Sequence, residues 1–266
     1  MYITNYTPHT INIIKEGYGF SSEVKRYVSA DAKVAVSLPS SGMLSAKIDT
    51  VEMPSIGKIP VFGKTVTGID PMPEADAIIT SAMYAQAAQI LGYKTDKLYT
   101  IADPVYDLSG RTVLGCLGVS PVLQGSAVGN AAHTNAAEFG DDVRIYNGTS
   151  LSVKILKGAE YTFSIRKYTA TENMETVSEL PSNGVLTAKM DITEMPPLEN
   201  IPVWSKKVTG IDQLPDGYDI YIVPALYVSA ARAVGADVSK LYTVADPVYT
   251  PDGRTILGCR GLCPAL

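Results

Sequence analysis

The chain has 266 residues, 46% of them hydrophobic, and a formal net charge of −5 at pH 7. This length fits two domains of ordinary size, and the apolar content is that of a globular protein. The negative charge excludes a general affinity for long nucleic acid, because binding duplex or single strands requires a basic surface.

Short runs typical of β-strands dominate the first part of the chain. They are β-branched or alternate apolar and polar residues, and they cover residues 10–15, 33–38, 44–49, 61–66 and 112–115. Residues 39–42, Pro-Ser-Ser-Gly, are typical of a hairpin turn between two of these strands, and residues 108–110 predict a second hairpin. One helix is predicted between Ser81 and Gly92, where apolar residues recur at helical spacing.

A polar segment then separates two halves. Residues 124–142 read QGSAVGNAAHTNAAEFGDD and show no hydrophobic period, so we predict a flexible linker with a reach of roughly 25 Å. It would join a first repeat lobe, 1–123, to a second repeat lobe, 143–266.

The second lobe repeats the first. Residues 240–261 match residues 97–118 at 16 of 22 positions, and shorter matches extend the repeat toward the start of each lobe. In the second lobe, residues 219–223 predict a strand, and Pro224 and Gly235 bound a predicted helix. We therefore predict an α+β fold of two homologous lobes related by a pseudo-two-fold axis. Each lobe would be a mostly antiparallel β-sheet with one main α-helix.

The C-terminal hairpin of each lobe keeps an Asp, a Tyr and an Arg within nine positions. The planar fork of arginine suits a phosphate or carboxylate, and a tyrosine ring offers a flat face to a base. The alternative is an Asp–Arg salt bridge across the hairpin with Tyr packed beneath it. These residues are Asp103, Tyr106 and Arg111 in the first lobe, and Asp246, Tyr249 and Arg254 in the second.

Two further patterns add candidates. Two cations followed by a Tyr occur in both lobes; they would help to hold an anion, or else display charge on an edge strand. A retained tyrosine pair could line a groove, although tyrosines equally suit a protein–protein contact. The ligand-binding candidates added here are Lys25, Arg26, Arg166, Lys167, Tyr99 and Tyr242.

The sequence offers few candidates for catalytic residues. Of two histidines, His133 lies in the linker, and His9 faces Thr149 in the second lobe, so a histidine base would exist in one lobe only. No zinc-ligand spacing, Walker loop or serine elbow occurs, and Cys116 and Cys259 are typical of buried small residues. We expect no cofactor and no metal. An odd number of cysteines and an N-terminus unlike a signal peptide predict a cytoplasmic protein.

Three segments resemble a widespread group of small single-lobe proteins of phages and bacteria, mostly of unassigned function. The segments are residues 5–11 with a Thr-Pro-His strand, 59–61, and 110–116 with the Gly-Arg turn and Gly-Cys strand. Phages encode small β-rich proteins that sequester the nucleotide signals of bacterial defence, and the resemblance implies such a sponge. It also adds His9 to the candidate ligand-binding residues, although the second lobe has Gly148-Thr149 in place of Pro8-His9.

We therefore predict a non-catalytic binding protein that sequesters a small anionic nucleotide-like signal, of the cyclic oligonucleotide or cyclic ADP-ribose type. The expected partners are that ligand and, in a homo-oligomer, further copies of the chain; no long nucleic acid and no membrane are expected. If phage-encoded, the protein would act in the host cytoplasm. One alternative is a structural virion or assembly protein, and another is a nucleotide-cleaving enzyme that uses His9 or retained carboxylates.

Overall fold

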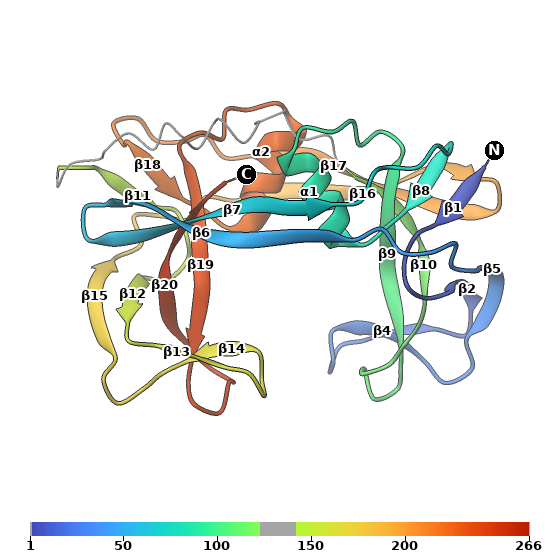
Figure 1. Cartoon of the computed structure of the whole chain (residues 1–266), viewed down its shortest axis with the longest axis horizontal. Helices are drawn as coiled ribbons and strands as arrows, with labels where there is room; N and C mark the ends of the chain where they lie inside the picture. The colour runs from blue at the N-terminus through green and yellow to red at the C-terminus, as the bar shows by residue number, and fades with distance from the viewer. Residues whose placement is uncertain (1, 123–141, 266) are drawn as a thin grey trace. The chain divides into compact units, whose positions relative to one another are not determined.

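The computed structural model describes residues 2–122 and 142–265 (Figure 1). The predicted linker, 124–142, lies outside these residues except for Asp142. The chain divides into two compact units, and neither is continuous in sequence. Unit 1 holds the described residues of Met1–Ile48, Val66–Ala127 and Asp191–Lys207, and unit 2 those of Asp49–Thr65, Val128–Met190 and Val208–Leu266. Each unit thus contains one segment taken from the other repeat.

The first sheet has ten strands among the described residues, and its central order is β1-β8-β9-β10-β17-β16. β2 adds to β10, β5 to β2, β4 to β9 and β3 to β4. The bounds are β1 Ile3–Asn5, β2 Ile11–Glu16, β3 Gly19–Ser21, β4 Arg26–Ser29, β5 Lys33–Leu38, β8 Ala77–Ile79, β9 Leu98–Asp107, β10 Val113–Pro121, β16 Ala188–Leu198 and β17 Ile201–Ile211.

The second sheet repeats this arrangement with its own ten strands, in the central order β11-β18-β19-β20-β12-β15. β7 adds to β20, β6 to β7, β14 to β19 and β13 to β14. The bounds are β6 Ala46–Ile56, β7 Ile59–Ile69, β11 Ile145–Asn147, β12 Val153–Lys157, β13 Glu160–Thr162, β14 Lys167–Thr169, β15 Glu175–Leu180, β18 Ile220–Ile222, β19 Leu241–Tyr249 and β20 Ile256–Pro264.

The two repeats exchange their longest hairpins. β7 comes from the first repeat, yet it pairs in parallel with β20 of the second, with Val61 opposite Leu262. Ile56 and Ile59 at the end of this hairpin are buried in the core of unit 2, together with Ile155. Burial of aliphatic side chains is the main favourable term in folding, so unit 2 depends on this hairpin for part of its core.

Unit 1 is completed in the same way by the hairpin of the second repeat. β17 pairs in parallel with β10, with Val203 opposite Val119. Leu198 and Ile201 are buried in the same cluster as Ile13. Each repeat therefore supplies core residues to a unit built mostly from the other repeat.

The predicted α+β fold class is wrong. Strands account for 53% of the residues that the structure describes, and helices for 7%. Helices do lie at the two predicted positions, α1 at Ala82–Ile90 and α2 at Ala225–Ala233, but each has only nine residues. The longest ladder of the first sheet, β9 with β10, is antiparallel as predicted, but the sheet is mixed, because β1, β2, β4, β8 and β17 join it through shorter parallel pairs. The fold is all-β in character, with mixed sheets.

One predicted hairpin is wrong and the other is confirmed. Residues 39–42 do not join paired strands, since β5 pairs with β2 and β6 pairs with β7. The turn at 108–110 does join β9 and β10, which pair antiparallel with Tyr106 opposite Val113 (Figure 1, green).

The N-terminal register of the repeat also differs from the sequence expectation. Ile13 pairs with Cys116 in the first sheet, and Ile155 pairs with Cys259 in the second. The offset between the repeats is therefore already 142 at their start, and His9 corresponds to Leu151, not to Thr149. At this offset Asn5, Thr7 and Ile13 match Asn147, Thr149 and Ile155, but these identities are isolated and form no continuous run.

Candidate functional site

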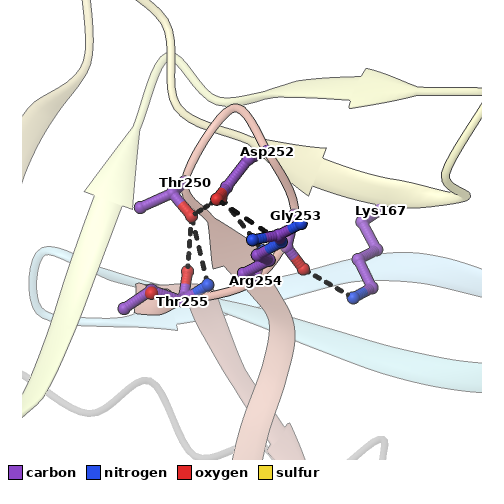
Figure 2. Close-up of polar contacts among 6 residues, drawn as sticks. All are labelled: Lys167, Thr250, Asp252, Gly253, Arg254 and Thr255. Atoms are coloured by element: carbon purple, nitrogen blue, oxygen red, sulfur yellow. Dashed lines mark hydrogen bonds and ion pairs between the residues drawn. The ribbon is translucent and has the colours of Figure 1, made fainter.

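The two arginines predicted to bind a ligand lie at the tips of the β9–β10 and β19–β20 hairpins. Arg111 is exposed, and the Arg254 side chain is 87% exposed, with its Nε 3.9 Å from Oδ2 of Asp252 (Figure 2). The predicted Asp–Arg bridge across the hairpin does not form at Arg254, because its nearby acid is Asp252 and not Asp246.

An aspartate organises the tip of the first hairpin. Asp107 accepts a hydrogen bond from Ser109 Oγ at 2.7 Å and from the backbone N–H of Arg111 at 3.1 Å. These donors favour the charged form and lower the pKa of Asp107 to about 2. In the second hairpin, Asp252 accepts from Thr250 Oγ1 and from the backbone of Arg254, which also lowers its pKa (Figure 2). The arrangement is a turn stabilised by its own side chains.

Arg26 of β4 and Lys167 of β14, one cation from each pair that precedes a tyrosine, hydrogen-bond to these turns. Arg26 Nη1 donates to the carbonyl of Gly110 at 2.7 Å, and its guanidinium lies 4.6 Å from the ring centre of Tyr106. Lys167 Nζ donates to the carbonyl of Gly253 at 2.8 Å (Figure 2) and lies 4.1 Å from the ring of Tyr249. The structure thus brings cations and phenol rings together, but within the turns.

The other predicted residues are spread over each unit. Tyr242 is buried in a core, which raises the pKa of its phenol, and Tyr99 packs against the corresponding core of unit 1. Lys25 and Arg166 are exposed at equivalent left-handed positions, with φ of 52° and 54°. His9 is exposed; its backbone carbonyl accepts from Asn5 Nδ2 at 2.9 Å.

A cleft of about 350 Å³ lies in unit 1, away from the hairpin tips. It is lined by α1, which contributes Gln86, by the first half of β9 and by the end of β10. The exchanged β17 supplies Trp204 and Lys206, and β9 supplies Asp103. A flat ring, a cation, a carboxylate and an amide therefore share one cavity.

Unit 2 has a smaller cavity of about 180 Å³ built from the equivalent strands. Its residues Phe62, Lys64 and Asp246 occupy the positions of Trp204, Lys206 and Asp103. The carboxylate of Asp246 already forms an ion pair within the chain, because Arg260 Nη1 lies 3.1 Å from its Oδ2. Of the candidates named from sequence, only Asp103 and Asp246 line these two cavities.

Sequence reasoning missed the tryptophan and both lysines of the cavities. They lie in the exchanged hairpins, and the signal that could have found them is the repeat itself. Lys64 and Lys206 are equivalent, and each follows an aromatic residue by two positions in the segment after Ile-Pro-Val. The longest identical run between the repeats lies in the C-terminal hairpins, which is why the predicted site residues lie there.

Cys116 and Cys259 are buried, and burial raises the pKa of each thiol to about 11. Both therefore remain protonated near neutral pH and are poor nucleophiles. Within residues 2–122 and 142–265, no cluster of three or more His, Cys, Asp and Glu side chains could hold a metal ion. None of the helices described there has the length and apolar character needed to cross a bilayer.

Comparison of the chain with protein-family models, with curated proteins and with solved structures found no match. The resemblance to small phage and bacterial proteins therefore stays a prediction.

Proposed function

We propose that the chain is a binding protein that captures a small anionic nucleotide-like ligand without turning it over, and that the unit 1 cleft is its site. The observation that carries the proposal is the joint presence of Trp204, Lys206 and Asp103 around one 350 Å³ cavity. Pockets for small ligands usually span roughly 300–1,000 Å³, so this cleft has room for one nucleotide moiety, whereas the 180 Å³ cavity of unit 2 does not.

The chemistry of the cleft fits the parts of a nucleotide. A half-buried indole gives a base a flat apolar surface, and stacking of this kind contributes about 1–3 kcal/mol per base. Lys206 is exposed at the rim, where an ammonium group can meet a phosphate without first losing its hydration. The Thr100 and Ser120 hydroxyls and the Gln86 amide can hydrogen-bond to sugar and base.

Analysis of the nucleotide released from the protein distinguishes capture from turnover. The protein is incubated with cyclic mononucleotides, cyclic dinucleotides and ADP-ribose, then removed, heated and its released contents analysed. We expect depletion of at least one nucleotide and its recovery intact. Recovery of a cleaved product would instead indicate an enzyme, and no depletion across the panel would contradict the proposal.

The position of the site is tested with matched variants. Lys206→Ala should weaken binding by about tenfold, because a charge-assisted contact is lost, whereas Lys64→Ala at the equivalent position of unit 2 should not. The double variant Arg111→Ala with Arg254→Ala tests the hairpin tips predicted from sequence. Loss of binding in the double variant with retention in Lys206→Ala would move the site from the cleft to those tips.

A further inference from the structure

In unit 2, an arginine of the chain itself meets Asp246, the aspartate equivalent to Asp103 of the cleft. The guanidinium of Arg260 lies 4.3 Å from the ring centre of Tyr168 and 5.1 Å from that of Phe62. The same group donates from Nη1 to Oδ2 of Asp246 at 3.1 Å. A planar group with N–H donors is thus held against a carboxylate and two aromatic rings.

Unit 1 keeps the equivalents of the residues that contact Arg260 but has no arginine at the equivalent position. Asp103, Trp204 and Tyr27 are the equivalents of Asp246, Phe62 and Tyr168, while Leu117 stands where the second repeat has Arg260. The backbone geometry is also shared, since Asp103 and Asp246 both have a φ of 47° in the left-handed region. A non-glycine residue rarely adopts this conformation, so its retention in both units gives the two aspartates the same local backbone.

The carboxylate of Asp103 is half-buried, lines the 350 Å³ cleft, and has no hydrogen bond or ion pair with the other residues that the structure describes. A carboxylate removed from water needs donors to replace its hydration. In unit 2 one such donor is Nη1 of Arg260. In unit 1 they must come from water or from a ligand.

We propose that the unit 1 cleft recognises a guanine base, with the Asp103 carboxylate accepting from the paired ring N–H and exocyclic amino group of that base. This inference rests on the proposed nucleotide-binding function. The two donors of guanine lie in one plane, side by side. One of them would take the place of the Arg260 Nη1–H that meets Oδ2 of Asp246, and the other would meet the second carboxylate oxygen. Trp204 stacks on the base, as Phe62 lies beside the Arg260 guanidinium, and Lys206 meets the phosphate.

Adenine cannot make the same contact. Its corresponding edge carries one amino donor beside a ring-nitrogen acceptor, which would face the carboxylate with like partial charge. A site built to satisfy a polar group discriminates strongly against an analogue that leaves the group unpaired. We expect guanine nucleotides to bind at least about tenfold more tightly than adenine nucleotides.

The test is titration calorimetry with GMP, cyclic di-GMP, AMP and cyclic di-AMP, each against the whole chain. Asp103→Asn should remove most of the guanine preference, and asparagine tolerates the left-handed backbone at this position. Leu117→Arg should supply an internal guanidinium to Asp103 and reduce GMP binding by about tenfold or more. Asp246→Asn, the matched control in unit 2, should leave GMP binding unchanged. Thermal unfolding of each variant verifies that it is folded.

A ligand with a guanidinium group could donate to Asp103 in the same way as guanine, and L-argininamide is the probe for such a ligand. Tighter binding of argininamide than of GMP would overturn the guanine assignment. Nucleotide binding without a guanine preference, or a preference that survives Asp103→Asn, would overturn this inference while leaving the proposed function intact. If none of the four nucleotides nor those of the earlier panel binds, the proposed function itself fails.

Discussion

At the scale of single residues, Asp107 controls the first hairpin through its charge. Its folded pKa is lowered to about 2 from 3.8, so the ionised form stabilises the turn above about pH 4 and this contribution disappears as the pH falls to 2. We expect Asp107→Asn to lower the melting temperature at pH 6 and to match the parent chain near pH 2. Melting curves across this range check the prediction, and a difference independent of pH would contradict it.

The residues of the site show what sequence comparison can and cannot find. Asp103 and Asp246 were identified because both repeats retain them. Arg260 was not identified, because its position is one of the six differences within the 22-residue match, where Leu117 faces it. Searching two copies for identity selects shared scaffold and turn residues, including Arg111 and Arg254, and passes over a position at which the copies have diverged. Trp204 was missed for the same reason, since its partner is Phe62.

At the scale of elements, the exchanged β17 crosses β10 at a glycine. A Cβ on Gly118 would lie 2.4 Å from the backbone carbonyl oxygen of Pro202, a contact that only movement of β17 can relieve. We expect Gly118→Ala to lower the free energy of unfolding by about 1–3 kcal/mol, measured by urea denaturation. Gly68→Ala is the control, because its nearest new neighbour, Lys47 Cβ, is 4.0 Å away. Equal losses in both variants would indicate a general backbone effect and not a clash.

The same elements explain the error in fold class. The sequence predicted strands at 44–49 and 61–66, but β6 and β7 each extend over eleven residues. Pro54 and Pro60 lie within them, and proline normally argues against a strand because it cannot donate to the ladder. The parallel pairs were likewise hidden, since pairing of β7 with β20 joins residues about two hundred positions apart and leaves no local pattern. The helices were visible because helical periodicity is a local property.

At the scale of the whole molecule, each unit is built mainly from one repeat but depends on a hairpin of the other repeat for part of its core. Ile59 is 4% exposed in the unit 2 core, and Ile201 is 2% exposed in the unit 1 core. Removing such a buried side chain costs about 2–5 kcal/mol, through lost burial and the cavity that remains. The loss should appear in the unit that receives the hairpin.

We therefore expect Ile59→Ala, although it lies in the first repeat, to reduce hydrogen-exchange protection in β12 and β20 of unit 2. Protection in β2 and β10 of unit 1 should change less. Ile201→Ala provides the mirror-image control and should affect β2 and β10 more than β12 and β20. Exchange followed by mass spectrometry resolves these strands, because opening of a local cooperative region reports its own stability. If each variant instead loosens the strands of its own repeat, the hairpins pack against the repeat that carries them, and the exchange is refuted.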